Sequence, residues 1–498
     1  MYDLYKPLRN YLRKHELFSG LKAVYYYFQF LQFDVALPRE LQHPELSLRP
    51  PYDLGLFEWE LQTLTREMLL NCAEDVGHSL FSWKAIAAAN NKIKHIENET
   101  WGLLAKEGDI SFEMARIANR QFHWQLGMNQ PTISRYFRIA NHHLIRPMVI
   151  DEFGMTPEEM FQIGVSLSGH FLGQAVLKTP ISNEVNSVSP EKCAAFLVRF
   201  CRTLTEHKAL ARSAQTYDIN WAYNFNSLEE FPLIRISEHQ ILCPIPTMLL
   251  RRFCDGLYFD LVRRGNEFHP TFGLAYEDYV GDVSSAANIR GTFQILKAER
   301  YGPRTARKDT IDWLLFDDSA TLFIECKASR VRLQAKVDLL ARESIYIELR
   351  KLAGFIVQTY ATLSDALHGQ YESWKPAGTP VYPFIVTLDN WQRFGLIIND
   401  AISENVKAAF DEKGLDQNLL AEHPYTLCAI EEFEQAIQIM AVVGIDNFMS
   451  KKIIGEQARW ELVTFITRFF EAEAVEHTKA LFGLEFAALE KGNGSTKP

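Results

Sequence analysis

The chain has 498 residues, enough for about three domains of ordinary size. Apolar residues make up 47% of the sequence and charged residues 23%, which excludes a disordered, collagenous or fibrous chain. The net charge of −10 argues against nucleic acid as a partner of the chain as a whole. No apolar run approaches the roughly 18 residues of a membrane span, and no export signal is visible. We therefore expect a cytoplasmic protein with no membrane partner.

The cysteines give no sign of a disulfide framework or a zinc site. Seven of them are dispersed through the chain, and none forms a CxxC pair. An odd, scattered set in a long chain is typical of reduced thiols in the core.

The first region, residues 1–235, has apolar positions at helical spacing and is expected to be mostly helical. Thr156 is followed by proline and two glutamates, a pattern that predicts the start of a helix with a capping box. A second interpretation takes residues 132–145 as the second helix of a helix-turn-helix, with Arg135 and Arg138 exposed. We expect this region to serve recognition, assembly or regulation.

Near residue 232 the sequence changes from apolar positions at helical spacing to short apolar runs. Residues 232–236 and 241–246 are short apolar runs edged by proline, which predict strands. We expect a mixed domain over residues 236–395, a helical region over 396–490 and a disordered tail over 491–498.

The most informative segment is a β-hairpin predicted over residues 311–326. Apolar runs at 311–316 and 321–326 flank the turn signal Asp317-Asp318-Ser319. Near-continuous apolarity indicates strands covered on both faces. A turn at this place pairs residues whose numbers sum to 637, so Asp312 is expected opposite Glu325.

Three charged side chains then meet on one face of an apolar hairpin. Lys327 lies two residues beyond Glu325, so it shares the face of Glu325 and Asp312. Two neighbouring buried carboxylates are costly unless a cation compensates. Hard oxygen ligands with room for water and phosphate favour Mg²⁺.

This pattern resembles the signature of the PD-(D/E)xK nuclease superfamily, which has the restriction-endonuclease-like fold. Asp312 stands thirteen residues before Glu325-Cys326-Lys327, and residues 272–280 resemble the family's first core helix, which carries Glu277. Residues 349–365 read as a helix containing Gln358, and residues 381–388 as a following strand. The resemblance covers about residues 265–395, although isoleucine rather than proline precedes Asp312.

The resemblance implies an α/β (α+β) protein with a restriction-endonuclease-like mixed sheet core, flanked by large and mostly helical regions. It implies a Mg²⁺-dependent endodeoxyribonuclease in which Mn²⁺ can substitute for Mg²⁺. Asp312, Glu325, Glu277 and the Cys326 carbonyl would hold the metal. Lys327 would orient the attacking water, and Gln358 would face the active site. The large flanking regions suggest an effector of prokaryotic restriction or anti-phage defence, by analogy of fold only.

Charge is unevenly distributed in this acidic chain. Residues 251–352 carry a small excess of Lys and Arg, whereas the rest of the chain is strongly acidic. Six basic residues form the strip expected to contact phosphates: Arg290, Lys297, Arg300, Arg304, Arg307 and Lys308. The expected partner is DNA, with RNA as the alternative.

Several alternatives stay open at this point. Asp278 rivals Glu277 and Asp309 rivals Asp312 as the metal ligand. The chain could also be a nuclease-like binding or regulatory subunit that no longer cuts. A further alternative is a scaffold in which Asp312, Glu325 and Lys327, called the trio below, form a structural ion pair. Cutting both strands with one site per chain would favour a homodimer or higher oligomer. With no P-loop in the sequence, any movement driven by nucleotides would need a separate NTPase partner.

Overall fold

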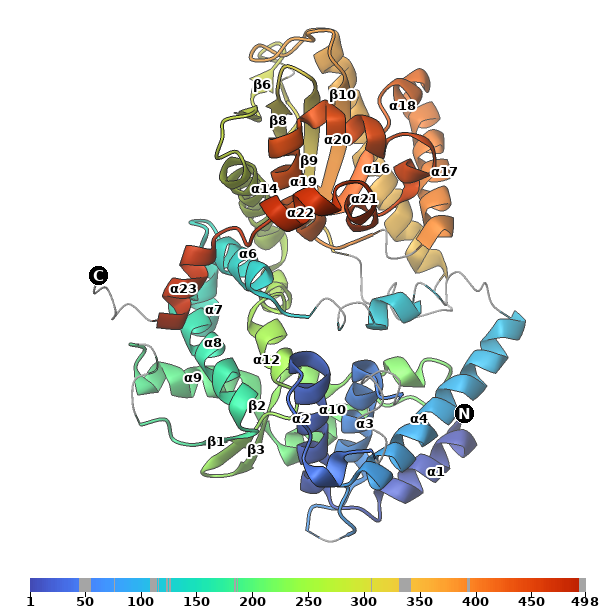
Figure 1. The fold of residues 1–498 in the computed structure, drawn as a ribbon, viewed down its shortest axis with the longest axis vertical. Coiled ribbons are helices and arrows are strands. Elements are labelled where there is room, and N and C mark those ends of the chain that lie inside the picture. The colour runs from blue at the N-terminus through green and yellow to red at the C-terminus, as the bar shows by residue number, and fades with distance from the viewer. Residues whose placement is uncertain are drawn as a thin grey trace. The chain divides into compact units, whose positions relative to one another are not determined.

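The computed structural model describes residues 1–43, 55–75, 77–107, 114, 116–121, 124, 127–182, 185, 187–305, 307–330, 342–391 and 395–491. The protein is mixed α/β, with more helix than strand. The chain divides into two compact units (Figure 1). Unit 1 consists of Met1–Ile110, Arg120–Arg264 and Gly483–Pro498, and unit 2 of Ser111–Asn119 and Gly265–Phe482.

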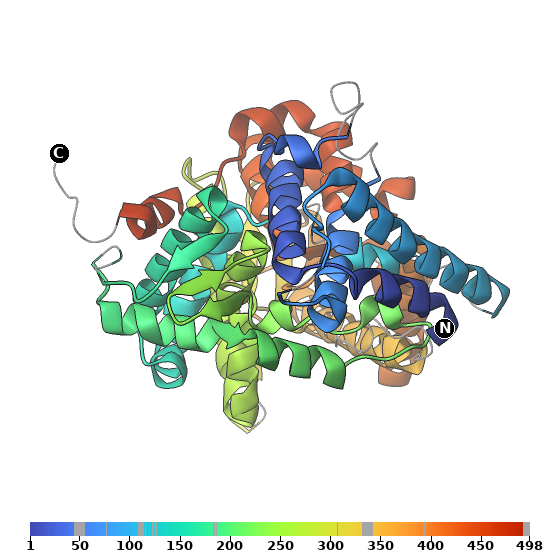
Figure 2. The same cartoon turned by 90° about the horizontal axis from the view of Figure 1, so that it is seen from below.

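Unit 1 is mainly helical, as expected for the N-terminal region. Its helices are α1 (Tyr2–Leu12), α2 (Leu17–Phe33), α3 (Glu58–Asn71), α4 (Trp83–Glu107), α6 (Gln130–Asn141), α7 (Arg146–Phe153), α8 (Pro157–Gly173), α9 (Pro190–Phe200), α10 (Leu204–Ser213), α11 (Ser227–Glu230), α12 (Pro246–Phe253), α13 (Leu257–Leu261) and α23 (Gly483–Lys491). The first four surround one apolar core and lie beside one another in blue in Figure 2. The capping box at Thr156 and Glu159 begins α8, so that prediction is confirmed.

A four-stranded sheet also belongs to unit 1. Its strands are β1 (Val176–Lys178), β2 (Cys201–Thr203), β3 (Leu233–Ser237) and β4 (Gln240–Leu242), in the order β1-β4-β3-β2. The strands expected near residues 232 and 241 are present, but they pair with β1 and β2. The structure therefore places residues 236–264 in unit 1, and the division falls at Arg264 rather than at residue 235.

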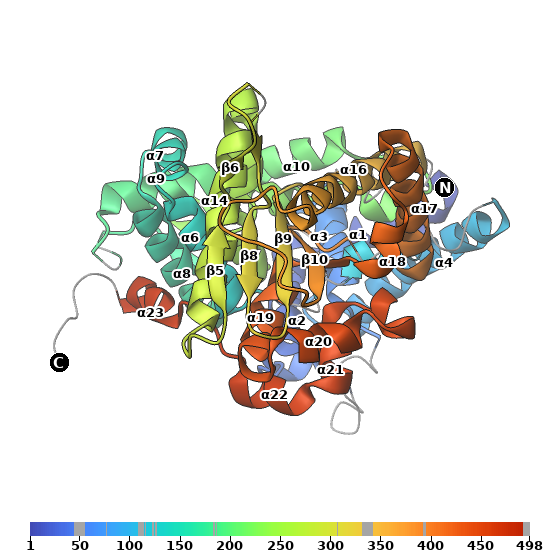
Figure 3. The same ribbon diagram turned by 90° about the horizontal axis from the view of Figure 1, so that it is seen from above.

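Unit 2 is built on a five-stranded mixed sheet in the order β11-β10-β9-β8-β5 (Figure 3). Its strands are β5 (Gln294–Lys297), β8 (Trp313–Phe316), β9 (Thr321–Lys327), β10 (Val381–Thr387) and β11 (Thr426–Ala429). Strands β9, β10 and β11 run parallel, whereas β8 and β5 are antiparallel to their neighbours. A two-stranded hairpin of β6 (Arg300–Tyr301) and β7 (Lys308–Asp309) interrupts the chain between β5 and β8.

Helices cover both faces of this sheet. On one face, α16 (Arg342–Leu367) and α17 (Gly395–Lys413) share an apolar core with Leu314, Phe323 and Ile385. On the other face lie α14 (Phe268–Ala287) and α19 (Ile430–Val443), joined by a 2.8 Å hydrogen bond from Tyr279 to Glu434. Burial on both faces explains the continuous apolar runs of β9 and β10.

The C-terminal region expected to be a separate helical part belongs largely to unit 2. Its β11 extends the sheet beside β10, and its remaining helices are α18 (Asn418–Glu422), α20 (Ile445–Lys452), α21 (Leu462–Phe469) and α22 (Glu471–His477). Helix α20 packs on the β8–β9 turn, where Asp317 and Ser319 accept hydrogen bonds from the amides of Ile445 and Asp446. The tail predicted to be disordered lies outside the described residues, except for Lys491, which ends α23.

Within the described part of the chain, no helix has both the length and the apolarity needed to cross a membrane.

Candidate active site

The β8–β9 hairpin forms in the register predicted from the sequence. Trp313 pairs with Ile324 and Phe316 with Thr321, so the numbers of paired residues sum to 637. The Asp317 carboxylate accepts hydrogen bonds from the amides of Ser319 and Ala320, which closes the turn. Continued by one residue beyond the start of β8, this register sets Asp312 opposite Glu325.

The predicted trio gathers at the end of this hairpin. Asp312 Oδ2 accepts a 2.7 Å hydrogen bond from the amide of Cys326, which ties it to β9 beside Glu325. Glu325 is 6% exposed and forms an ion pair with Lys327. Since Lys327 Nζ also lies 5.1 Å from the ring centroid of Phe355 on α16, the trio faces the side of the sheet that α16 covers.

Glu277 lies on α14, which covers the other face of the sheet, and its charge interacts with those of Asp312 and Glu325. The indole N–H of Trp313 donates a 2.9 Å hydrogen bond to the Glu277 carbonyl. At Gly281, one turn further along α14, a Cβ would lie 2.1 Å from the Trp313 ring, so only glycine allows the helix to pack this closely. The helix is thereby held against β8 with Glu277 near the hairpin end.

The charges of these residues influence one another. Burial, together with Glu325 and Glu277, raises the pKa of Asp312 well above its ordinary value. Burial and the Glu325 charge likewise raise the pKa of Glu277. Burial alone would lower the pKa of Lys327, but Glu325 and Asp312 hold that pKa above its usual value. The site is an enclosed group of acids around one ammonium.

The two rival acids have other partners. Asp278 pairs with Lys297, and Asp309 is exposed and lies 3.1 Å from Arg300. Neither Asp278 nor Asp309 is among the main influences on the pKa of Asp312. The geometry thus favours Glu277 and Asp312 over these alternatives.

Gln358 lies on α16, but its side chain is exposed, and no contact between it and the trio is seen among the described residues. Phe355 of α16 does contact Lys327. Gln358 follows Phe355 by three residues and so lies next to it on the helix surface. Its role in the site stays a prediction.

The donor set suits a hard cation, because carboxylate oxygens are the ligands that Mg²⁺ prefers. The ligands are not arranged around one point, however. Among the described residues, no three Asp, Glu, His or Cys side chains come together closely enough to hold a metal ion. Glu325 is instead turned to Lys327, and Asp312 to the Cys326 amide. A metal would have to displace these contacts.

The basic strip is partly neutralised within unit 2. Lys297 pairs with Asp278, Arg300 with Asp309, and Lys308 with Asp365 at 2.7 Å. The remaining three residues, Arg290, Arg304 and Arg307, are exposed and show no ion pair among the described residues. The loop between β6 and β7 carries Arg304 and Arg307, so it is the most available cationic part of the strip.

The helix-turn-helix interpretation fails on one of its two arginines. Helix α6 covers the expected residues, but Arg135 is only 4% exposed, and Arg138 forms an ion pair with Glu485 of α23. A recognition helix needs such side chains at its surface.

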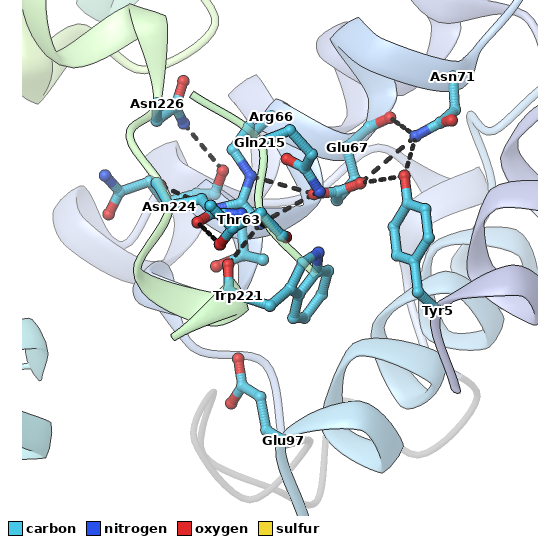
Figure 4. Close-up of polar contacts among 12 residues, drawn as sticks. Tyr5, Thr63, Arg66, Glu67, Asn71, Glu97, Gln215, Trp221, Asn224 and Asn226 are labelled. Carbon is cyan, nitrogen blue, oxygen red and sulfur yellow. Dashed lines mark hydrogen bonds and ion pairs between the residues drawn. The ribbon is translucent and has the colours of Figure 1, made fainter. Parts of the chain in front are cut away.

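A polar cluster that the sequence did not reveal lies in the core of unit 1 (Figure 4). Arg66 and Glu67 on α3 are almost fully buried and paired at 2.8 Å. Arg66 also donates to the carbonyls of Trp221 and Asn224, and Tyr5 donates a 2.8 Å bond to Glu67. These bonds tie α1 and the 221–224 turn to α3, which indicates a structural role in unit 1.

Comparison with known proteins adds no relative to this description. No family model, no curated protein and no solved structure matches the chain.

Proposed function

We propose that unit 2 is a metal-dependent nuclease of the PD-(D/E)xK kind, which hydrolyses phosphodiester bonds of DNA. The observation that carries the proposal is the meeting of Asp312, Glu325 and Lys327 at the end of one hairpin, with Glu277 beside them. Three carboxylates around one ammonium are expensive to enclose, and a cation would relieve that cost.

The order of elements supports the proposal. Helix α14 is followed by the antiparallel strands β5, β8 and β9, then by helix α16 and the parallel strand β10. This order is similar to the restriction-endonuclease-like core that the sequence resemblance implies. The acids also lie at the carboxyl end of β9, where parallel strands of α/β sheets commonly present their functional residues.

Asp312, Glu325 and Glu277 would hold Mg²⁺ together with the Cys326 carbonyl. Bound there, Mg²⁺ would stabilise negative charge on the phosphate and lower the pKa of a bound water. Lys327 would orient the attacking water and donate a hydrogen bond to the scissile phosphate, once its pairing with Glu325 is released. Arg304 and Arg307 would bind flanking phosphates without reading sequence.

One observation favours a second candidate, a nuclease-like binding subunit that does not cut. Lys327 and Glu325 neutralise each other's charge in an ion pair, as they would in a purely structural role. A silent subunit would bind DNA through Arg304 and Arg307 yet show no cleavage with any divalent metal.

A plasmid-cleavage assay with Mg²⁺, with Mn²⁺ and with EDTA tests the proposal. We expect metal-dependent nicking or linearisation that Glu325→Gln and Asp312→Asn abolish, because each removes a metal ligand worth several kcal/mol of transition-state stabilisation. Asp309→Asn, the same change at an exposed acid, is the matched control and should cut normally. A wild-type protein that cuts neither DNA nor RNA under these conditions would refute the nuclease proposal.

The same variants give a second readout that needs no cleavage. Mg²⁺ should raise the thermal unfolding midpoint of the wild-type protein, because a ligand that binds only the folded state stabilises it. Glu325→Gln should lose this rise, and Asp309→Asn should keep it.

A further inference from the structure

A second lysine, Lys351, lies near the carboxyl end of β9, close to Asp312, Glu325 and Lys327. Helix α16 carries Lys351, an exposed residue whose Nζ donates a 2.5 Å hydrogen bond to the hydroxyl of Ser329. Ser329 follows Lys327 by two residues, just after the end of β9. Lys351 therefore approaches the same end of the strand from the helix that covers it.

Phe355 links the two lysines. Lys327 Nζ lies 5.1 Å and Lys351 Nζ 5.9 Å from the centroid of the same phenylalanine ring. The ring is half-buried, and attraction between an ammonium and a ring face restricts where each lysine can point. Two positive charges are thus held near each other at the edge of the acid cluster.

The two lysines differ in their polar partners. Lys327 is enclosed and paired with Glu325, whereas Lys351 is exposed and its observed polar partner is a neutral hydroxyl. No ion pair to Lys351 is seen in the described part of the chain. Its charge is available to an anion that reaches this edge of the sheet.

We propose that Lys351, assisted by Ser329, binds a phosphate of the nucleic acid strand next to the phosphate that is cut. This inference rests on the proposed nuclease function and adds a substrate-binding residue to it. An ammonium and a hydroxyl are both hydrogen-bond donors that suit a phosphate oxygen. Lys327 and Lys351 would then contact successive phosphates of one strand, with Phe355 setting their spacing.

The surface of α16 extends this phosphate site in one direction. Lys351, Phe355 and Gln358 follow the spacing i, i+4 and i+7, so they form one stripe along the helix. Gly354 lies beside this stripe and is exposed, and within the described part of the chain no atom lies within 4 Å of where its Cβ would be. The backbone of a nucleic acid strand can therefore approach α16 closely at this point.

The test is binding of a short fluorescent DNA duplex, and of its single strand, measured by anisotropy in EDTA so that no cleavage occurs. Lys351→Glu should raise the Kd at least tenfold, and Lys351→Arg should stay within about threefold of the wild type. The slope of log K against log salt should fall in magnitude by about 0.9 for the duplex or 0.7 for the single strand, the contribution of one phosphate contact. A purely structural lysine would leave that slope unchanged.

Lys407→Glu is the matched control, because Lys407 is an exposed lysine on α17 of the same unit and the change in charge is identical. It should bind like the wild type. In metal-supported cleavage, Lys351→Ala should raise KM several-fold and leave kcat within about threefold, as expected for a contact made equally in ground and transition states.

The outcomes separate the two proposals. If the wild type cuts DNA and Lys351→Glu binds no more weakly than Lys407→Glu, the role of Lys351 is refuted and the nuclease proposal stands. If the wild type neither binds nor cuts nucleic acid, the nuclease proposal fails and the role of Lys351 fails with it.

Discussion

Replacing Asp312 by asparagine should stabilise the metal-free protein while abolishing cleavage. Asparagine keeps an oxygen that can accept the Cys326 amide bond, and it removes one of the negative charges near Glu325. Because Asp312 has a raised pKa in the folded state, the folded protein binds this proton more tightly than the unfolded chain does. Wild-type stability therefore falls as the pH rises from the ordinary aspartate pKa of about 4 through the raised value.

The magnitude follows from the same linkage. A pKa that differs by one between the folded and unfolded protein corresponds to about 1.4 kcal/mol of stability, and the pKa of Asp312 is raised well above its ordinary value. Asp312 keeps partial exposure, so water screens part of the effect, and we expect the variant to be measurably more stable than the wild type at pH 8. At pH 4, where wild-type Asp312 is already mostly protonated, the gain should vanish.

Urea denaturation in EDTA at a series of pH values measures this difference. Asp309→Asn, at an exposed acid, should change the free energy of unfolding by no more than about 0.5 kcal/mol at either pH. An Asp312→Asn variant that is no more stable than the wild type at pH 8, or equally stabilised at pH 4, would refute the reasoning about the enclosed acid cluster.

Two further predictions concern the substrate surface and the packing of the site. Replacing Arg304 and Arg307 by glutamate should weaken DNA binding and flatten its salt dependence in anisotropy titrations, and unchanged affinity at low salt would mean that the β6–β7 loop is ordinary solvated surface. Gly281→Ala should lower stability by about 1 to 3 kcal/mol in thermal unfolding, because its Cβ would overlap the Trp313 ring, whereas Gly273→Ala on the same helix has open space and should be neutral or stabilising.

The hairpin and its register could be predicted from sequence because local rules determine them. Two apolar runs and the Asp317 turn leave one pairing that buries both strands, and the structure has that pairing. The strand β10 was predictable for a similar reason, since it is a long apolar run with clear ends. The helix predicted over residues 349–365 is present, but α16 begins seven residues earlier, at Arg342.

The domain boundary and the extent of the sheet could not be predicted, because they depend on tertiary pairing. Strands β3 and β4 look like any short proline-edged strands, and nothing local says that they join β1 and β2. Strand β11 is only four residues long and fully buried, and it lies between two helices in the sequence. A short apolar run in that position fits a segment of helix as well as a strand.

The partners of charged side chains were equally hidden. The sequence suggests six available cations, yet Lys308 is held by Asp365, a residue 57 positions away in the sequence. Lys351 could not be found from sequence for the same reason, since only the packing of α16 on the sheet brings it to Ser329. Spacing along one element can be read from sequence, whereas contacts between elements require the fold.

The charge balance of the site bears on the choice between a cation-binding centre and a structural ion pair. A structural role for Lys327 would need one carboxylate, and Glu325 supplies it. Asp312 and Glu277 are two further acids, and burial, together with neighbouring carboxylates, raises the pKa of each. With all three carboxyls ionised, the cluster carries two negative charges more than Lys327 neutralises, which is the charge of one divalent cation. On the proposed nuclease function, a bound metal would offset the charge of the two acids that the Lys327–Glu325 ion pair leaves over.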